Sequence, residues 1–439
     1  MNYGKYYNGI AQSEYDNGGF HALVGLDIHS KSGTVTCSKA MTNADTTPVV
    51  DGTPTCSVTI PDGNSFFAAG TKIFKVTSAG TVTLVHTSGQ GLVLGMDYLG
   101  TYLYYCTATK IGRQTLANAT SEASWSSETD AWGTFTNQKT YKPMVKQNLS
   151  LFIGDGKYVA AVDEAGTFSA NVLDLEPNQI VTALVPDREY LLIGTIAGTS
   201  SDKSGLFLWD TYSSSWTVSD TIDEKGINCF IPADNTIFIS AGTVGNIYYW
   251  ANRAELFTKL QDAGTTVTTG INPYASANLN GLPLFATSRG IFSLGRSDSK
   301  MPIAQCIEYV GSEGQGITTS GALTVSGSQV FYGWNKTSTY GIDKLSTNLY
   351  SGQIKTPIFL GKATRIKIAY SSLPASTSIT CKLSKDGGAY ATHTLVKDAT
   401  NEMAYRSENS IGNKATVQAE ITLTASTTTA PTIYDILVE

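Results

Sequence analysis

The sequence predicts an all-β protein, made of a seven-bladed β-propeller followed by a small C-terminal antiparallel β-sandwich. Charged residues fill only 15% of the 439 positions, while glycines (42) and tyrosines (23) are abundant. Aromatic and β-branched side chains pack well on a pleated sheet, and glycine suits the turns between strands. A strand–turn–strand phrase recurs to about residue 358, and a period-two alternation then replaces it.

The repeat is clearest at residues 236–250, where a strand, a glycine turn and a second strand ending in an aromatic residue follow each other. Similar phrases lie at 190–209 and 284–294. One marker residue in the second strand of each unit gives positions 67, 104, 152, 192, 238, 285 and 331, which are 37 to 48 residues apart. A four-stranded propeller blade takes about 40–50 residues, so seven markers predict seven blades.

The other strands of each unit follow from the same phrase. Predicted first strands are 182–185, 227–231 and 322–325, and predicted third strands are 72–76, 158–162, 206–209, 247–250 and 291–294. Residues 254–260 alone could form a helix, but Phe257 follows Trp250 by the same interval as Trp216 follows Trp209. The segment around Trp216 is rich in serine and unsuited to a helix. Both segments, 254–260 and 213–218, are therefore predicted to be outer strands.

The two ends of the chain have different patterns from the repeat. Residues 1–19 show no period and are predicted to be an N-terminal arm that a partner surface orders; 20–28 and 34–37 form a predicted hairpin. The predicted propeller spans 20–358. A ring needs a closing strand. Residues 25–30 resemble 341–346, so the N-terminal hairpin is a candidate to share the last blade and close the ring.

The predicted C-terminal β-sandwich spans 359–439. Its strands alternate apolar and polar side chains, as expected of a sheet with one buried face. They are predicted at 365–370, 378–383, 390–395, 415–423 and 433–438.

Composition argues against several classes of partner. The net charge is −6 and no block of Lys or Arg occurs, so no nucleic-acid partner is expected. No stretch approaches the roughly 20 apolar residues that span a bilayer, so no membrane insertion is expected. The N-terminus lacks the apolar region of a signal peptide. The six cysteines are far apart, which predicts reduced, buried thiols.

The search for chemistry predicts no catalytic, cofactor-binding or metal-binding residue. The four histidines are scattered, and 62–64 and 155–156 carry too few carboxylates for a calcium loop. The glycine run at 311–316 has no following helix to hold a phosphate. A glycosidase needs two carboxylates. Candidates in or next to turns are Asp187, Asp210, Asp234, Asp262 and Asp343.

Aromatic residues carry the remaining predictions. Those in the strands are expected to fill the core between blades, and those in the arm are expected to contact an assembly partner. The predicted inter-blade residues are Trp209, Trp250, Phe207, Tyr248 and Phe292. The predicted assembly-arm residues are Tyr3, Tyr6, Tyr7 and Tyr15.

Two stretches carry a resemblance to a known type of protein. The propeller opens with Ala-Leu-Val-Gly-Leu-Asp-Ile-His at 22–29 and closes with Tyr-Gly-Ile-Asp at 340–343, and the sandwich pattern of 365–438 follows. This order resembles β-propeller virion structural proteins of tailed bacteriophages, found in tail, nozzle or adsorption assemblies. The resemblance is mainly architectural and supplies no catalytic residue.

The resemblance implies a structural component of a phage virion, not an enzyme, made in the host cytoplasm and associated with the tail. Expected partners are other virion proteins, copies of the same chain in a symmetric ring, and a host-surface glycan. No cofactor is expected. The leading alternative is a carbohydrate-binding module for host-surface glycans, and the third is a glycoside hydrolase.

Overall fold

The fold is described from a computed structural model. It describes residues 10, 19–45, 50–127, 129–198, 202–233, 236–251, 253–262, 265–296, 303–315, 317–360, 365–394, 396–398, 403–407 and 416–438. Within these ranges the chain is almost entirely β, with one short 3-10 helix at Glu122–Ser127. No helix in the described part has the length and apolar character needed to cross a membrane.

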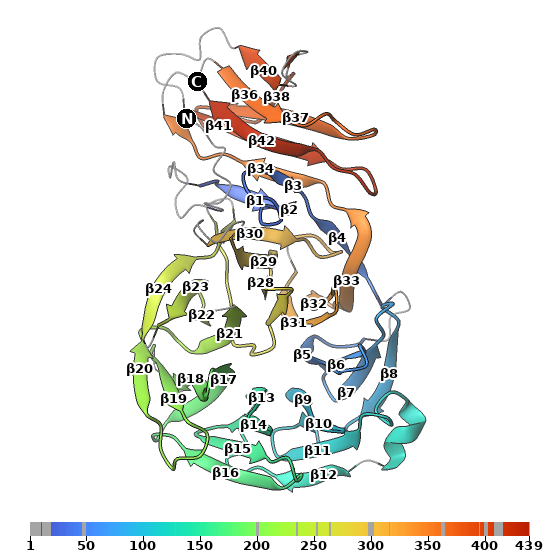
Figure 1. Ribbon diagram of the computed structural model, residues 1–439, viewed down its shortest axis with the longest axis vertical. Helices are drawn as coiled ribbons and strands as arrows, with labels where there is room; N and C mark the ends of the chain where they lie inside the picture. Colours follow the sequence, from blue (N-terminus) through green and yellow to red (C-terminus); the bar gives the residue numbers. More distant parts are fainter. Residues whose placement is uncertain are drawn as a thin grey trace.

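The larger part of the molecule is a β-propeller, a ring of antiparallel sheets around a central axis (Figure 1). Its first sheets are β5 (Pro54–Thr59), β6 (Ser65–Ala69), β7 (Lys72–Val76) and β8 (Val82–Thr87), and β9 (Gly95–Leu99), β10 (Tyr102–Cys106), β11 (Lys110–Thr115) and β12 (Thr129–Thr134). Next come β13 (Met144–Gln147), β14 (Ser150–Asp155), β15 (Tyr158–Val162) and β16 (Phe168–Asp174), and β17 (Gln179–Asp187), β18 (Tyr190–Ala197), β19 (Ser204–Trp209) and β20 (Val218–Ile222).

The ring continues with three further sets of strands. They are β21 (Ile227–Ala233), β22 (Thr236–Ala241), β23 (Asn246–Trp250) and β24 (Ala254–Lys259); β27 (Ser276–Leu279), β28 (Leu282–Thr287), β29 (Gly290–Gly295) and β30 (Ala304–Tyr309); and β31 (Thr319–Ser326), β32 (Gln329–Lys336) and β33 (Thr339–Leu349). The two-stranded sheet β25 (Gln261–Asp262) and β26 (Thr265–Thr266) lies in the connection after β24.

Apolar side chains seal the contacts between neighbouring sheets. Second strands such as β6 are buried along their whole length, because one face packs on the preceding sheet and the other on the following sheet. Five of the six apolar clusters described lie between two consecutive sheets of the ring. All six cysteines are buried free thiols, as the sequence predicted.

An N-terminal strand completes the set that starts with β31. Strand β4 (Lys39–Asn43) pairs antiparallel with β33, with Met41 opposite Leu345 and Asn43 opposite Asp343. The prediction that residues 25–30 share a sheet with 341–346 was wrong. Strand β2 (Leu26–Asp27) instead pairs with β3 (Val35–Cys37), which confirms the predicted hairpin but places it outside the ring.

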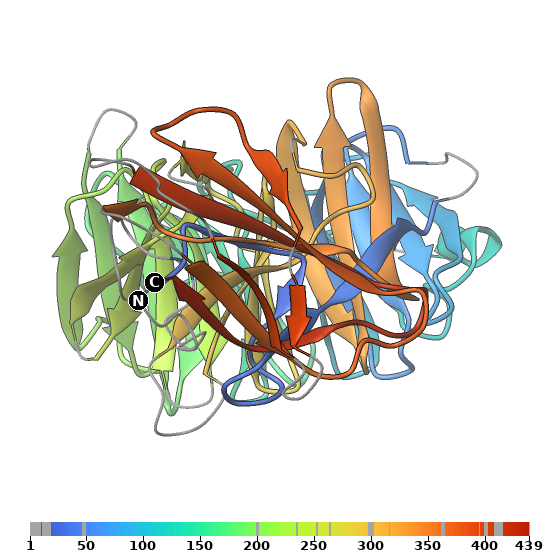
Figure 2. The same ribbon diagram turned by 90° about the horizontal axis from the view of Figure 1, so that it is seen from above.

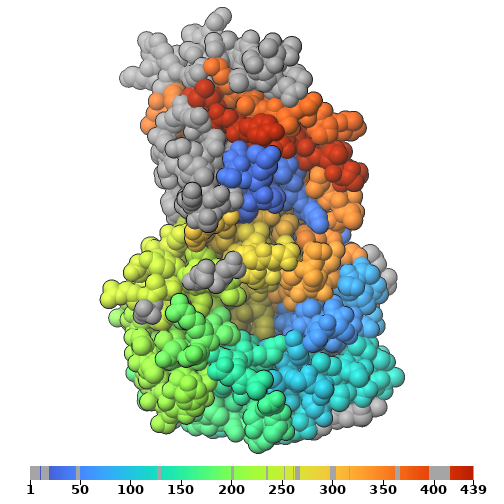
Figure 3. Space-filling view, viewed as in Figure 1, coloured from blue at the N-terminus to red at the C-terminus, as the bar shows by residue number. Residues whose placement is uncertain are grey.

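Strand β1 (Ala22–Val24) joins the ring to the C-terminal strands. It pairs parallel with β30 and antiparallel with β34 (Gly352–Lys355), and all three of its residues are buried. The β27–β30 sheet therefore continues through β1 and β34 into β41 (Thr416–Thr424), β37 (Ser378–Lys385) and β38 (Ala391–His393); the short β35 (Phe359–Leu360) also pairs with β41. In Figure 3 the blue N-terminal segment lies between the ring and the red C-terminal strands.

A second sheet lies next to the first at this end of the molecule (Figure 2). It contains β2, β3, β42 (Thr432–Val438), β36 (Arg365–Tyr370), β40 (Met403–Ser407) and β39 (Val396–Asp398). Strands from both sides of the predicted boundary at residue 358 thus share these two sheets. The alternating burial of β41 and β42 is the period-two pattern seen in the sequence.

One of the two predicted outer strands was misplaced. Residues 254–259 form β24 as predicted, but the strand equivalent to it, β20, begins only at Val218. Asp210 accepts hydrogen bonds from the backbone of Tyr212 and Ser213, which turns the chain before Trp216. The side-chain carboxylate satisfies these amides locally, so the serine-rich segment forms a turn instead of a strand.

Candidate functional site

The connection between β26 and β27 runs between strands on different sides of the ring, in the space named here the central channel. The hydroxyl of Tyr274 in this connection donates a hydrogen bond to the carbonyl of Lys142 (2.9 Å), and its carbonyl accepts one from the amide of Leu323 (2.8 Å). The amide of Asn272 donates to the carbonyl of Asn228 (3.1 Å). Tyr274 is thereby bound to sheets on opposite sides of the ring. It lines two cavities of this channel.

The larger of these cavities, about 420 Å³, is named here the threonine cavity. Its exposed hydroxyl groups come from four separate segments: Thr55, Thr140, Thr268, Thr318 and Thr319. Tyr141 and Phe285 add aromatic surface. None of the described lining residues is acidic, and the one basic residue, Lys142, has a fully buried side chain. The cavity is therefore uncharged and rich in hydrogen-bonding hydroxyls.

A buried ion pair holds the loop beside this cavity. The ammonium of Lys142 lies 2.5 Å from the carboxylate of Asp155, and neither side chain is exposed. The carboxylate also accepts hydrogen bonds from the amides of Asn137 (2.6 Å) and Lys139 (3.3 Å). Burial lowers the pKa of Lys142, and the charge of Asp155 opposes that shift. The pair fixes residues 137–142 against β14, which is a structural role.

The second cavity of the channel, about 340 Å³, has one acidic lining residue. Asp97 lies 3.4 Å from the ammonium of Lys146, which also stacks over the ring of Tyr98. Burial raises the pKa of Asp97 to about 6, and the positive charge of Lys146 opposes the rise. A single carboxylate already paired with a lysine does not make the two-carboxylate arrangement of a glycosidase.

Of the five candidate aspartates for glycoside hydrolysis, the four that the structure describes lie at separate places and have different partners. Asp187 accepts a hydrogen bond from the indole of Trp250 (3.0 Å), and Asp343 accepts from Ser312 and from the indole of Trp334. Asp210 forms its local turn, and Asp262 lies near Gln315 and Arg289. Asp234 lies outside the described residues. In the described ranges, no cluster of three His, Cys, Asp or Glu side chains could hold a metal ion.

The predicted inter-blade aromatics are buried or half-buried in three clusters. Trp209 and Phe207 pack between the sheets β13–β16 and β17–β20, and the Trp209 ring meets Phe152 edge-on at 5.5 Å. Trp250 and the half-buried Tyr248 lie between β17–β20 and β21–β24.

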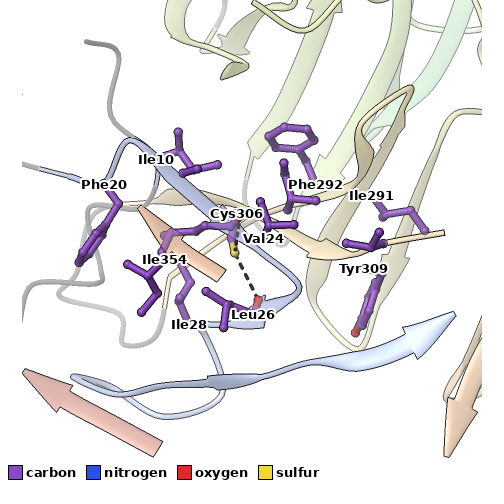
Figure 4. Close-up of a cluster of buried hydrophobic side chains, with 14 of the residues drawn as sticks. Ile10, Phe20, Val24, Leu26, Ile28, Ile291, Phe292, Cys306, Tyr309 and Ile354 are labelled. Atoms are coloured by element: carbon purple, nitrogen blue, oxygen red, sulfur yellow. Dashed lines mark hydrogen bonds between the residues drawn. The ribbon is translucent and has the colours of Figure 1, made fainter. Parts of the chain in front are cut away.

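Phe292 occupies a different environment. It belongs to the cluster that joins the ring to β1, close to Val24 (Figure 4). The predicted arm residues Tyr3, Tyr6, Tyr7 and Tyr15 lie outside the described residues.

Sequence reasoning missed Tyr274 and the threonine cavity. The available signal was the length of the connection from residue 260 to 275, which is long for a propeller and contains Asn-Pro-Tyr at 272–274. No sequence pattern indicated the cavity itself. Its threonines come from segments far apart in the chain, and each one alone is typical of a strand end.

Comparisons with known proteins agree with the propeller. The extracellular domain of a hybrid two-component system from B. thetaiotaomicron is similar at a TM-score of 0.53 and 12% identity, over 88% of this chain and 58% of that one. A second such domain from the same organism has a TM-score of 0.48 at 11% identity, over 77% of this chain and 44% of that one. The chain thus spans about half the length of these domains.

A third similar structure is the β-propeller domain of Cps50 (Swd1) from Myceliophteria thermophila, with a TM-score of 0.49 and 13% identity over 70% of this chain and 100% of that one. At these identities a likeness concerns the fold alone, and the propeller itself is described by the sheets of this structure. No protein-family model and no curated protein matches the sequence.

Proposed function

We propose that this chain is a non-catalytic structural component of a phage virion, associated with the tail, that presents rigid surfaces to neighbouring virion proteins. The observation that carries the proposal is the continuous sheet from β27 through β1 to β38, which crosses from the ring to the C-terminal strands without a linker. In the finer description that we propose, the ring is a seven-bladed propeller closed by β4, and the C-terminal sheets form a β-sandwich.

Rigidity is what favours an assembly role over a mobile binding module. Val24 faces Ile307 on one side of β1 and Gln353 on the other, so backbone hydrogen bonds cross the junction on both edges of the strand. A hinge between two domains needs a few residues that can change backbone angles freely. Within the described residues, this junction instead carries ladder pairing and a buried apolar cluster. Such a body can transmit load and keep fixed angles between its partners.

The experiment is to purify particles and ask whether the chain is part of them. We expect it to co-sediment with intact particles in a fixed copy number per particle, and antibody labelling in negative stain to mark one site on the tail. A chain that is absent from washed particles, or present in varying amounts, would refute the virion role. The labelled position would also show which virion proteins contact it.

A second function, carbohydrate binding, is favoured by the threonine cavity. Its volume lies within the range typical of small-ligand pockets, and hydroxyl-rich uncharged surfaces with adjacent aromatics suit neutral sugars. We expect a glycan array to show binding that is lost in Thr319→Val, which keeps the side-chain shape. The control is Thr221→Val on the outer strand β20. Equal binding by wild type and Thr319→Val would rule out this cavity as the sugar site.

A further inference from the structure

A cavity of about 650 Å³ lies where the ring meets the N-terminal strands, and is named here the seam cavity. Residues from β2, β3, β4 and β30 line it, together with the turns after β27 and β31. It is separate from the central channel, because its described lining residues do not include Tyr274. Figure 4 shows the adjoining apolar cluster, in which the thiol of Cys306 contacts the carbonyl of Leu26.

Glu308 on β30 is the unusual residue of this cavity. It is only 4% exposed, and its Oε2 atom has no hydrogen-bond partner. Most buried polar atoms in proteins are hydrogen-bonded, so a buried carboxylate oxygen without a partner needs a separate explanation. A ligand that supplies the missing donor is one such explanation. The strand itself is held in place, since its backbone carbonyl at Glu308 accepts a hydrogen bond from the hydroxyl of Ser38.

Titratable and polar side chains from several elements surround Glu308. Asp27 comes from β2 and His29 from the turn that follows it. The hydroxyls of Ser293 on β29 and of Tyr309 on β30 are hydrogen-bonded to the carboxyl group of Glu308, which leaves Oε2 as its unpartnered atom. Burial lowers the pKa of His29 to about 4, so this imidazole is neutral near pH 7 and accepts or donates a hydrogen bond with Ser293 (2.9 Å). Lys39 and Arg296 also line the cavity, but both are exposed to solvent.

We propose that the seam cavity binds a protonated primary amine, held by the carboxylates of Glu308 and Asp27. An ammonium group offers three donors in a small volume, and Glu308 Oε2 is a buried acceptor without a partner. A carboxylate that is removed from water is stabilised when a cation pairs with it. A metal ion is a poorer fit, because the described residues contain no group of three acidic, His or Cys ligands.

The protonation state of Glu308 gives the proposal a specific signature. Burial, and then the negative charge of Asp27, raise the pKa of Glu308 to about 8, so the empty cavity holds mostly the neutral acid at pH 7. A bound ammonium favours the carboxylate form and displaces the proton to solvent. Binding should therefore release a proton at pH 7 and become tighter as the pH rises toward 8.

The amine could come from a free polyamine or from a lysine side chain of another protein. Two probes separate these sources: putrescine and Nα-acetyl-lysine amide. Calorimetric titration of the full-length protein, in phosphate and in HEPES at pH 7, measures affinity and the number of protons released. Binding of both probes shows that the ammonium group alone is recognised. Binding of one alone identifies a polyamine or a protein-borne lysine.

Glu308→Gln is the matched variant, because it keeps the shape and cannot ionise. We expect at least a tenfold loss of affinity and no proton release. The control Glu176→Gln makes the same substitution in an exposed loop and should bind as wild type does. Binding of neither probe at millimolar concentration, equal binding by Glu308→Gln, or binding without proton release would overturn the proposal. The proton measurement needs only the wild-type protein, so it stands even if the variant folds poorly.

Discussion

Two regions of the molecule differ in the hydrogen-bond donors that they supply to a buried carboxylate, Asp155 in one region and Glu308 in the other. Asp155, on a regular sheet of the ring, has a lysine and two backbone amides as donors. Glu308, where strands from both ends of the chain meet, keeps one oxygen without a partner. Asp155 is thus engaged by donors of its own region, whereas Glu308 leaves a buried acceptor that a ligand can use.

The largest effect that tests this comparison is expected from Lys142→Met. Removing the ammonium leaves the carboxylate of Asp155 buried without its ion-pair partner, which typically costs about 3–5 kcal/mol. Urea denaturation should show this loss, and the double variant Lys142→Met/Asp155→Leu should recover part of it. The control is Lys157→Met, whose pair with Asp174 is partly exposed and should matter little. Equal losses in Lys142→Met and Lys157→Met would contradict the structural role of the buried pair.

Unlike Lys142→Met, the substitution Glu308→Gln should increase the free energy of unfolding as the pH rises. A carboxyl whose pKa is raised in the folded protein destabilises it progressively as the pH rises from its ordinary value of 4.5 to about 8. The glutamine variant cannot ionise at this position, so its stability lacks this decrease with rising pH. Relative to wild type it should therefore gain on the order of 2–4 kcal/mol between pH 5 and pH 8.5 in amine-free buffer.

The pH dependence from His29 does not confuse this test. Its lowered pKa removes stability as the pH falls from 6.5 toward 4, and it does so in both proteins. The measurement is the free energy of unfolding across the pH range for wild type and variant. Parallel curves of unfolding free energy against pH would show that the pKa of Glu308 is not raised. In this respect the seam would then resemble the regular ring.

The smallest effect is expected from Tyr274→Phe. It removes one hydrogen bond, from the hydroxyl to the carbonyl of Lys142, and typically costs about 1 kcal/mol. Hydrogen exchange should increase at the amide of Leu323, which bonds to the Tyr274 carbonyl, if the connection loosens. Tyr212→Phe is the control, because that side chain is 78% exposed. Unchanged exchange at Leu323 would indicate that packing alone holds the connection.

The ring was predictable from the sequence because its signal is local and repeated. All seven marker residues of the predicted second strands lie in strands of the structure, residue 67 in β6 for example, since a turn and an apolar run decide each strand. The segment 213–218 was misplaced because Asp210 satisfies the nearby amides, a contact that the repeat pattern does not encode.

The sites were less predictable because they depend on pairing between distant segments. Glu308 reads as one polar residue in the strand Ala-Gln-Cys-Ile-Glu-Tyr, and its burial comes from strands that begin near residue 22. The threonine cavity likewise joins segments from residue 55 to residue 319. No local pattern marks which of many threonines or acids will face a common space.

The pairing of β4 with β33 also determines the order in which the molecule can form. Met41 meets Leu345 only after roughly 300 further residues have left the ribosome. Contacts so distant in sequence form slowly, because the long loop between them must first be closed at an entropic cost. Until then the last sheet has an unpaired edge that another chain could occupy. Synthesis of this protein thus passes through an open ring, whose lifetime would influence how much of the chain aggregates before it closes.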